Sequence, residues 1–122
     1  MMISFSIVEE LHGMKLREYK RVEDGYLALF QKGDAVRTFR FFVGRDVRGL
    51  SMTALRERPK VNYCYVVVPM SIVDTVEWMM AYFSLSRKLY ENGVGIISSL
   101  DNTVVMRSRY VPVPARLDEV VQ

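Results

Sequence analysis

Cysteine and histidine are almost absent from this chain of 122 residues, which contains one of each. The single cysteine, Cys64, excludes a disulfide within the chain, and zinc sites built from several Cys and His ligands are excluded too. This cysteine usage favours a reducing, cytoplasmic location. Cys64 lies inside an apolar run, where a buried structural thiol is far commoner than a nucleophile. A catalytic triad would have to use His12, near the end of a short predicted helix.

Long apolar segments and phosphate-binding glycine motifs are also missing. No run of about 20 apolar residues occurs, so we expect no membrane span. The start of the chain lacks the basic residues and the cleavage site of a signal peptide. Gly93 and Gly95 follow a predicted helix and precede a predicted strand, whereas phosphate-cradling glycines follow a strand and open a helix. Neither a dinucleotide fingerprint nor a P-loop is therefore predicted.

The composition is that of an ordinary globular protein, with 50% hydrophobic and 25% charged residues. The length predicts a single domain over residues 1–122, with 111–122 as a C-terminal tail or short docking segment. Residues 1–60 contain 12 Lys/Arg and 8 Asp/Glu, whereas residues 61–122 contain 5 and 6. A basic first half favours a polyanionic partner, and a solvated charged face is the alternative. Arginine outnumbers lysine 12 to 5, a weak sign of a thermophilic source.

The strand predicted between Val61 and Pro69 organises the second half of the chain. Its run YCYVVV has no charged or strongly polar position, which is typical of a strand covered on both faces. Residues 71–92 follow as the longest helical pattern, and residues 94–98 form the next predicted strand. The length of this crossover predicts a βαβ unit with two parallel strands.

In the first half of the chain, the remaining predicted elements are a helix at 3–12, ended by Gly13, a basic strand or arm at 15–21, and a hairpin of strands 26–31 and 36–43. A helix at 50–58, capped by Ser51, follows the hairpin, and a return strand is predicted at 104–110. Turn residues separate them, with Glu23-Asp24-Gly25 before the hairpin. The predicted fold class is therefore α/β. We expect a mixed central sheet with an antiparallel N-terminal hairpin and a βαβ crossover.

The helix predicted at 71–92 has an apolar arc over about half its circumference. A surface helix that packs on one sheet needs only about 100°. The stripe predicted to remain for a partner consists of Trp78, Tyr82, Leu85 and Leu89. An apolar surface of this kind marks an interface, and a two-fold homodimer is the simplest closed assembly.

A known family shares this order of elements. A hairpin, a helix, a buried strand ending in VVVP, a long helix and a strand beginning Gly93-Val94-Gly95-Ile96 follow one another between residues 5 and 110. This order resembles the restriction-endonuclease-like (PD-(D/E)xK) superfamily, which includes archaeal Holliday-junction resolvases and RecB-like nucleases. The resemblance implies a nuclease-like fold of archaeal type. For an active member it also implies Mg²⁺-dependent cleavage of DNA.

The resemblance also implies positions for an active site. Asp24 matches the first acid of the family, and Glu9 or Glu10 matches an acid of the first helix. The family's Glu-x-Lys falls on Val43-Gly44-Arg45, where valine replaces the metal-binding acid. Arg45 keeps the positive charge but cannot act as a base. A metal would have one or two ligands at best, which implies an inactivated member kept for binding or assembly.

Three functions remain open. The favoured one is a non-catalytic domain, without a cofactor, that binds nucleic acid as a homodimer, with Tyr19 and Tyr26 stacking on unpaired bases. The predicted phosphate-binding residues are Lys15, Arg17, Lys20, Arg21, Arg37, Arg40, Arg45 and Arg48. One alternative is an interaction subunit of a larger complex, without nucleic-acid contact. The other is an active metal-dependent nuclease with a displaced acid such as Asp46, although ion pairing with the flanking arginines is the simpler explanation of that residue.

Overall fold

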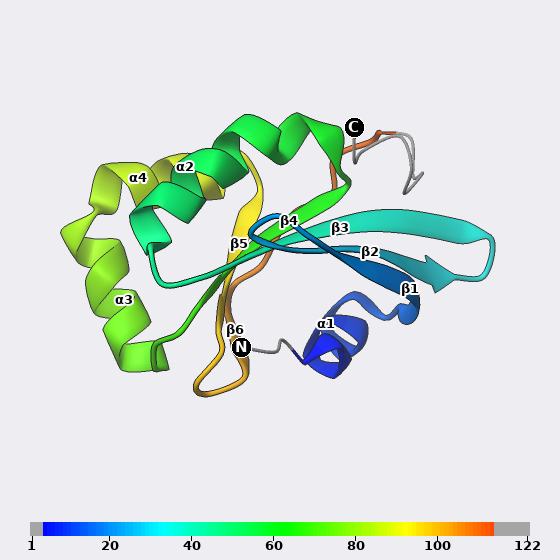
Figure 1. Ribbon diagram of the computed structural model, residues 1–122, viewed down its shortest axis with the longest axis horizontal. Coiled ribbons are helices and arrows are strands. Elements are labelled where there is room, and N and C mark those ends of the chain that lie inside the picture. The colour runs from blue at the N-terminus through cyan, green and yellow to red at the C-terminus, as the bar shows by residue number, and fades with distance from the viewer. Residues whose placement is uncertain (1–3, 114–122) are drawn as a thin grey trace.

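A six-stranded sheet, with its strands in chain order, forms the centre of the computed structural model, which describes residues 4–113 (Figure 1). The elements are α1 (Phe5–His12), β1 (Lys15–Val22), β2 (Gly25–Lys32), β3 (Ala35–Val43), α2 (Val47–Glu57), the 3₁₀ helix η1 (Arg58–Lys60), β4 (Tyr63–Val68), α3 (Ile72–Ala81), α4 (Phe83–Glu91), β5 (Val94–Ser98) and β6 (Thr103–Met106). Strands β1, β2 and β3 are antiparallel, β3, β4 and β5 are parallel, and β6 is antiparallel to β5. The predicted α/β class, with its hairpin and βαβ crossover, is confirmed.

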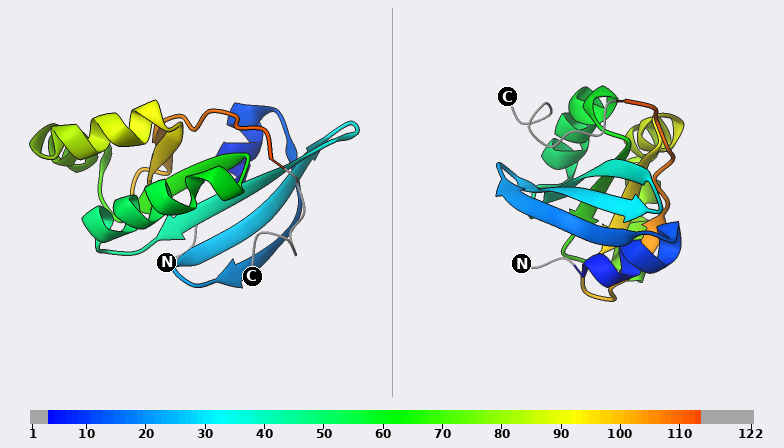
Figure 2. Two further views of the ribbon diagram at one scale, coloured as in Figure 1. Left: turned by 90° about the horizontal axis from the view of Figure 1, so that it is seen from above. Right: turned by 90° about the vertical axis from the view of Figure 1, so that its right-hand side faces the viewer.

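The two faces of the sheet carry separate apolar cores because side chains alternate along β4. Cys64, Val66 and Val68 belong to the core beneath α2 and α4. Tyr65 and Val67 belong to the core on the opposite face, beneath α1. Figures 1 and 2 show α2, α3 and α4 over one end of the sheet and the β2–β3 hairpin extending beyond them. The prediction of a strand covered on both faces is confirmed, since β4 is buried from residue 64 to residue 68.

The single helix predicted at 71–92 is wrong, because the helix breaks at Tyr82. Tyr82 has a ψ of 54°, outside the helical range, and separates α3 from α4. The break leaves carbonyls of the last turn of α3 without helical partners. The Ser86 hydroxyl donates to one of them, the Met79 carbonyl, at 3.1 Å. The helical wheel of a straight helix therefore misplaces the residues that follow the break.

Three smaller predictions in the chain also need correction. Helix α2 begins at Val47, and its cap is Asp46, whose carboxylate accepts from the Gly49 amide at 3.0 Å. Ser51, the predicted cap, is buried and donates to the Val47 carbonyl. The ion pair predicted for Asp46 is not formed; within residues 4–113 the ion pairs are Lys60–Glu57 and Arg87–Glu91. Strand β6 ends at Met106, short of the predicted 110.

Hydrogen bonds from buried polar side chains hold the segment after β6 against the sheet. The Asn62 amide donates to the Val111 carbonyl at 2.9 Å, and its oxygen accepts from the Thr38 amide. Arg58 donates to the Arg109 carbonyl from the other side. Of the predicted tail at 111–122, residues 114–122 lie outside the described part. None of the helices between residues 4 and 113 combines the length and the apolar character needed to cross a membrane.

Candidate functional site

The turn between β1 and β2 brings several of the predicted site residues together. Asp24 has a positive φ of 62°, and its carbonyl accepts from the Val43 amide at 2.7 Å. Gly25 has a φ of 148°, and a Cβ there would lie 1.9 Å from the Phe41 carbonyl oxygen. Only glycine allows this approach. The turn is therefore held against the end of β3, beside Arg40 and the loop that carries Arg45.

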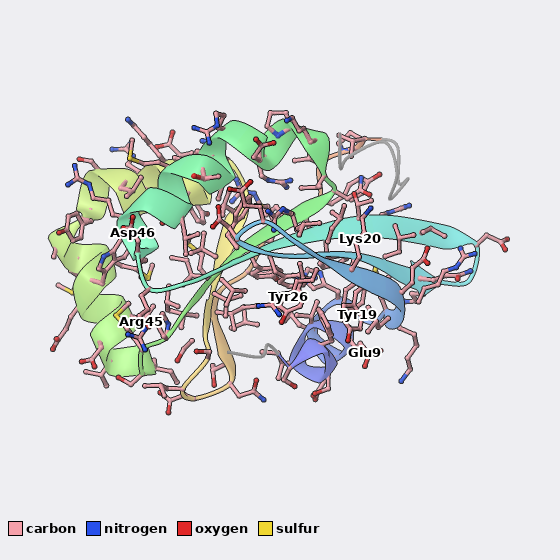
Figure 3. The ribbon with its side chains drawn as sticks, in the orientation of Figure 1. Glu9, Tyr19, Lys20, Tyr26, Arg45 and Asp46 are labelled. Atoms are coloured by element: carbon pink, nitrogen blue, oxygen red, sulfur yellow. The ribbon has the colours of Figure 1, made fainter. Side chains whose placement is uncertain are left out.

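Strand β1 is a basic edge of the sheet. Its exposed cations include Lys15, Arg17 and Arg21, and the register shifts between Leu16 and Glu18. The extra residue turns Tyr19 toward α1, where its ring lies 5.0 Å from that of Phe5. Figure 3 shows Tyr19 and Tyr26 on the α1 side of the hairpin and Lys20 on the other side. With Tyr19 53% exposed, the edge presents both cations and an aromatic ring.

Two hollows adjoin the β1–β2 turn. The larger, of about 550 Å³, lies between the turn, β3 and α2, and we call it the turn hollow. Its charged lining consists of Arg21, Arg40, Arg56 and Lys60 with Glu23, Asp24 and Glu57. The smaller hollow, of about 400 Å³, shares Arg21 and Asp24 and adds Tyr26, Val43 and Arg45. The sequence did not predict a role for Arg56 and Lys60, whose place beside the hairpin depends on how α2 packs.

Arg40 is the most firmly held cation in the turn hollow. Its guanidinium lies 4.1 Å above the ring of Phe42. It donates to the Phe41 carbonyl at 2.7 Å and to the carbonyls of Tyr26 and Glu23. Burial lowers the pKa of Arg40, an effect that nearby groups, Asp24 among them, partly oppose. No carboxylate lies within ion-pair distance of it in the described chain. Arg40 is thus a fixed, partly desolvated cation without a counterion.

The active-site residues implied by the resemblance do not all lie close together. The Glu9 carboxylate accepts from the Leu16 amide at 2.7 Å and ties α1 to β1. Figure 3 shows Glu9 by α1 and Arg45 far from it, toward the opposite end of the molecule. Asp24 and Arg45 share the smaller hollow, and Glu9 does not line it. Among residues 4–113, no three His, Cys, Asp or Glu side chains are grouped so that they could hold a metal ion.

Two of the predicted phosphate-binding arginines lie away from the turn. Arg37 is five residues before Phe42 on β3, and its guanidinium lies 4.9 Å above the ring of Tyr110. Arg48, in α2, lies 5.8 Å above the ring of Tyr82. The eight predicted cations therefore do not form one patch. The turn gathers some of them, and the remaining arginines pack against tyrosines elsewhere.

The single histidine and the single cysteine are structural. His12 Nε2 lies 2.7 Å from the Tyr65 hydroxyl, and Nδ1 is buried without a hydrogen-bond partner in the described structure. Burial, aided by Arg107, lowers the pKa of His12 to about 4, and burial raises the pKa of Tyr65 to about 12. The hydrogen bond therefore joins a neutral imidazole to a neutral phenol. Cys64 is fully buried, as predicted, and burial raises its pKa to about 12.

The outer surface of α3 and α4 is strongly apolar, but of the four predicted interface residues only Tyr82 is exposed there. Leu89 was predicted to face a partner and is fully buried in the core. Trp78 packs against the same core, Leu85 is half-buried, and Tyr82 is 42% exposed. Besides Ile72 and Tyr82, the exposed apolar side chains of α3 and α4 are Val73, Val76, Met80, Phe83 and Tyr90. We call these five residues the outer helix face.

Comparison with known proteins adds no relative. No family model matches the chain, and neither the curated proteins nor the solved structures gave a significant match. Function must therefore be argued from the surfaces described above.

Proposed function

We propose that this chain is a non-catalytic, nuclease-like domain that binds nucleic acid, DNA above all, along β1 and around the β1–β2 turn. The observation that carries the proposal is the basic edge strand that leads to Arg21, beside a hollow where Arg40 has no counterion. Arginine forks bind phosphate oxygens in pairs, and exposed Tyr19 offers a ring for stacking. The order α1, hairpin, α2, buried β4, helical pair and β5 also supports the proposed kinship with restriction-endonuclease-like proteins.

The absence of catalysis is part of the proposal. Val43 stands where that family has a metal-binding acid, and its neighbours Asp24 and Arg45 do not replace the missing carboxylate. Asp46, the displaced acid of an active nuclease, is already engaged as the cap of α2. The arrangement favours holding a nucleic acid over cutting it.

The binding proposal predicts a strong dependence on salt. Labelled single-stranded, duplex and branched DNA should bind in fluorescence anisotropy at low salt, because Lys15, Arg17, Lys20 and Arg21 replace counterions on phosphates. The double variant Lys15→Ala/Arg17→Ala should weaken binding about tenfold or more and reduce the slope of log K against log salt by about 2. Lys88→Ala, on α4, removes a matched surface charge and should leave binding unchanged. Absence of binding to all three DNA forms at low salt would contradict the proposal.

A second function, self-association, is favoured by the outer helix face. Met80, Phe83 and Val73 are 72%, 65% and 66% exposed, and a hollow of about 560 Å³ beside them is lined mostly by apolar side chains. Exposed Asp74 and Glu77 lie in α3, whereas exposed Lys88 and Arg87, the latter paired with Glu91 at 2.9 Å, lie in α4. A two-fold contact can set the acidic helix of one copy against the basic helix of the other. We therefore propose that the partner on this face is a second copy of the chain.

Light scattering coupled to gel filtration tests the dimer. The unmodified chain should elute as a dimer, and Met80→Glu/Phe83→Glu should elute as a monomer, because it introduces charge into the apolar contact. Tyr19→Glu is the control, since it places one carboxylate at an exposed aromatic position on β1, away from the outer helix face. A strict monomer at every concentration tested, or dissociation by the control alone, would exclude this interface.

A further inference from the structure

We propose that the turn hollow binds the terminal phosphate of a nucleic-acid strand, so that the protein recognises strand ends. The inference rests on the proposed function and specifies its ligand. It depends on three features of the hollow: a preset guanidinium, two further unpaired arginines and a position at the end of the basic edge.

The preset guanidinium is that of Arg40. Three backbone carbonyls and the face of Phe42 fix its plane, so binding an anion costs little side-chain ordering. All of these acceptors are uncharged, and the guanidinium has five N–H donors. Arg40 therefore keeps its full positive charge and has donors left for a ligand. A phosphate oxygen placed there would supply the missing counterion in a partly desolvated environment.

Arg21 and Arg56 line the same hollow from the hairpin and from α2. Both are exposed, and neither forms an ion pair within the described residues. Lys60 is different, because it already pairs with Glu57 at 2.6 Å. The hollow thus has three guanidinium groups from three separate elements, none of them in an ion pair within the described residues, a number that suits the several oxygens of one phosphate.

Two carboxylates limit which anions the hollow accepts. Glu23 and Asp24 also line it, so the three arginines exceed the free carboxylates by one charge. A phosphate monoester carries a charge of about −1.5 to −2 near neutral pH, whereas a diester within a strand carries one negative charge. Attraction and repulsion both grow in proportion to the charge of the ligand, and the net charge of the hollow is positive, so the monoester gains more net electrostatic stabilisation than the diester. This balance favours the end of a strand over its internal phosphates.

The position of the hollow fits a strand that ends there. The cations of β1 run from Lys15 to Arg21, and Arg21 belongs to both the edge strand and the hollow. The turn, the sheet and α2 border the hollow on three sides. A strand that follows β1 would place its final phosphate beside Arg21, within reach of Arg40 and Arg56.

Fluorescence anisotropy with one DNA sequence in three forms tests the inference. The single strand is prepared with a 5′-phosphate, with a 3′-phosphate or with hydroxyl groups at both ends. One phosphorylated form should bind about tenfold more tightly than the hydroxyl form. Arg56→Ala should remove this preference and leave binding of the hydroxyl form nearly unchanged. Arg40→Lys should also remove the preference, and it should weaken the hydroxyl form as well, because Arg40 belongs to the proposed nucleic-acid surface. Arg56 is exposed, so its variant tests the site even where Arg40→Lys perturbs the fold. Lys88→Ala should retain the preference.

The outcomes separate this inference from the proposed function. Equal affinity for all three forms overturns strand-end recognition and leaves nucleic-acid binding standing. Loss of all DNA binding overturns both. Inorganic phosphate should compete for the extra affinity of the phosphorylated strand and not for the hydroxyl strand. A further result would assign the hollow to free phosphate and overturn strand-end recognition. In it, inorganic phosphate stabilises the protein against unfolding, Arg56→Ala abolishes that stabilisation, and all three strands bind equally.

Discussion

Replacing Arg58 with alanine is expected to lower the free energy of unfolding by on the order of 3–5 kcal/mol. Arg58 is only 3% exposed. Its guanidinium donates to the carbonyls of Val61 at 2.8 Å, Asn92 at 2.9 Å and Asn62 at 3.1 Å, and also to that of Arg109. Alanine would leave four carbonyls without this donor in a cavity too deep for easy solvation.

The arrangement explains why one side chain has so large an effect. The four acceptors belong to the residues just before β4, the C-cap of α4 and the segment after β6, three places that are far apart in sequence. Burial lowers the pKa of Arg58, and its hydrogen-bond acceptors are neutral carbonyls. Its role is therefore to connect chain segments by hydrogen bonds, not to neutralise an acid. Arg58→Lys should recover only part of the stability, because an ammonium has three donors and cannot reproduce the planar fork.

Urea unfolding followed by circular dichroism measures this effect. Arg56→Ala is the matched control, since it removes an exposed arginine from the same stretch and should change stability by less than about 0.5 kcal/mol. A loss below about 1 kcal/mol for Arg58→Ala would show that the guanidinium does not hold these segments together.

Local signals in the sequence predicted most of the fold. The uninterrupted apolar run at 63–68 predicted a strand buried on both faces, and β4 is one. Gly13 predicted the end of α1, where it adopts the left-handed conformation with a φ of 64°. Turn residues separated β1, β2 and β3 almost at their observed bounds. Each of these features is decided by neighbours in the chain, which is why the sequence alone is sufficient.

Features that depend on distant contacts could not be predicted. No proline or glycine marks the break at Tyr82, where α3 ends and α4 begins. Arg58 lies in the charged stretch RERPK, where nothing local distinguishes it from its exposed neighbour Arg56. The basic character of the first half was evident from the sequence. Which cations meet was not, because the meeting of Arg21, Arg40 and Arg56 depends on the hairpin register and on the packing of α2.

Replacing Gly95 with alanine is expected to destabilise the protein by about 3 kcal/mol or to prevent folding. A Cβ at this position of β5 would lie 2.3 Å from Cε1 of Tyr65, 2.5 Å from the carbonyl oxygen of Met106 and 2.6 Å from the amide nitrogen of Ser108. Two of these atoms are backbone, so relief requires β6 and the following segment to move. The third belongs to the buried ring of Tyr65, and a shift of that ring would strain its hydrogen bond with His12.

Thermal and urea unfolding test this prediction, with Gly44→Ala as the matched control. A Cβ at Gly44 would meet only the side chain of Leu50, at 3.2 Å, and that side chain can adjust. The control should therefore cost less than about 1 kcal/mol. Burial is the main cause of the lowered pKa of His12, so in a folded Gly95→Ala protein a displacement of Tyr65 that admits water to the imidazole should bring this pKa from about 4 back toward 6.5, which NMR titration can follow. Unchanged stability with an unchanged His12 titration would show that the sheet accommodates the methyl group and that close approach is not why glycine occupies this position.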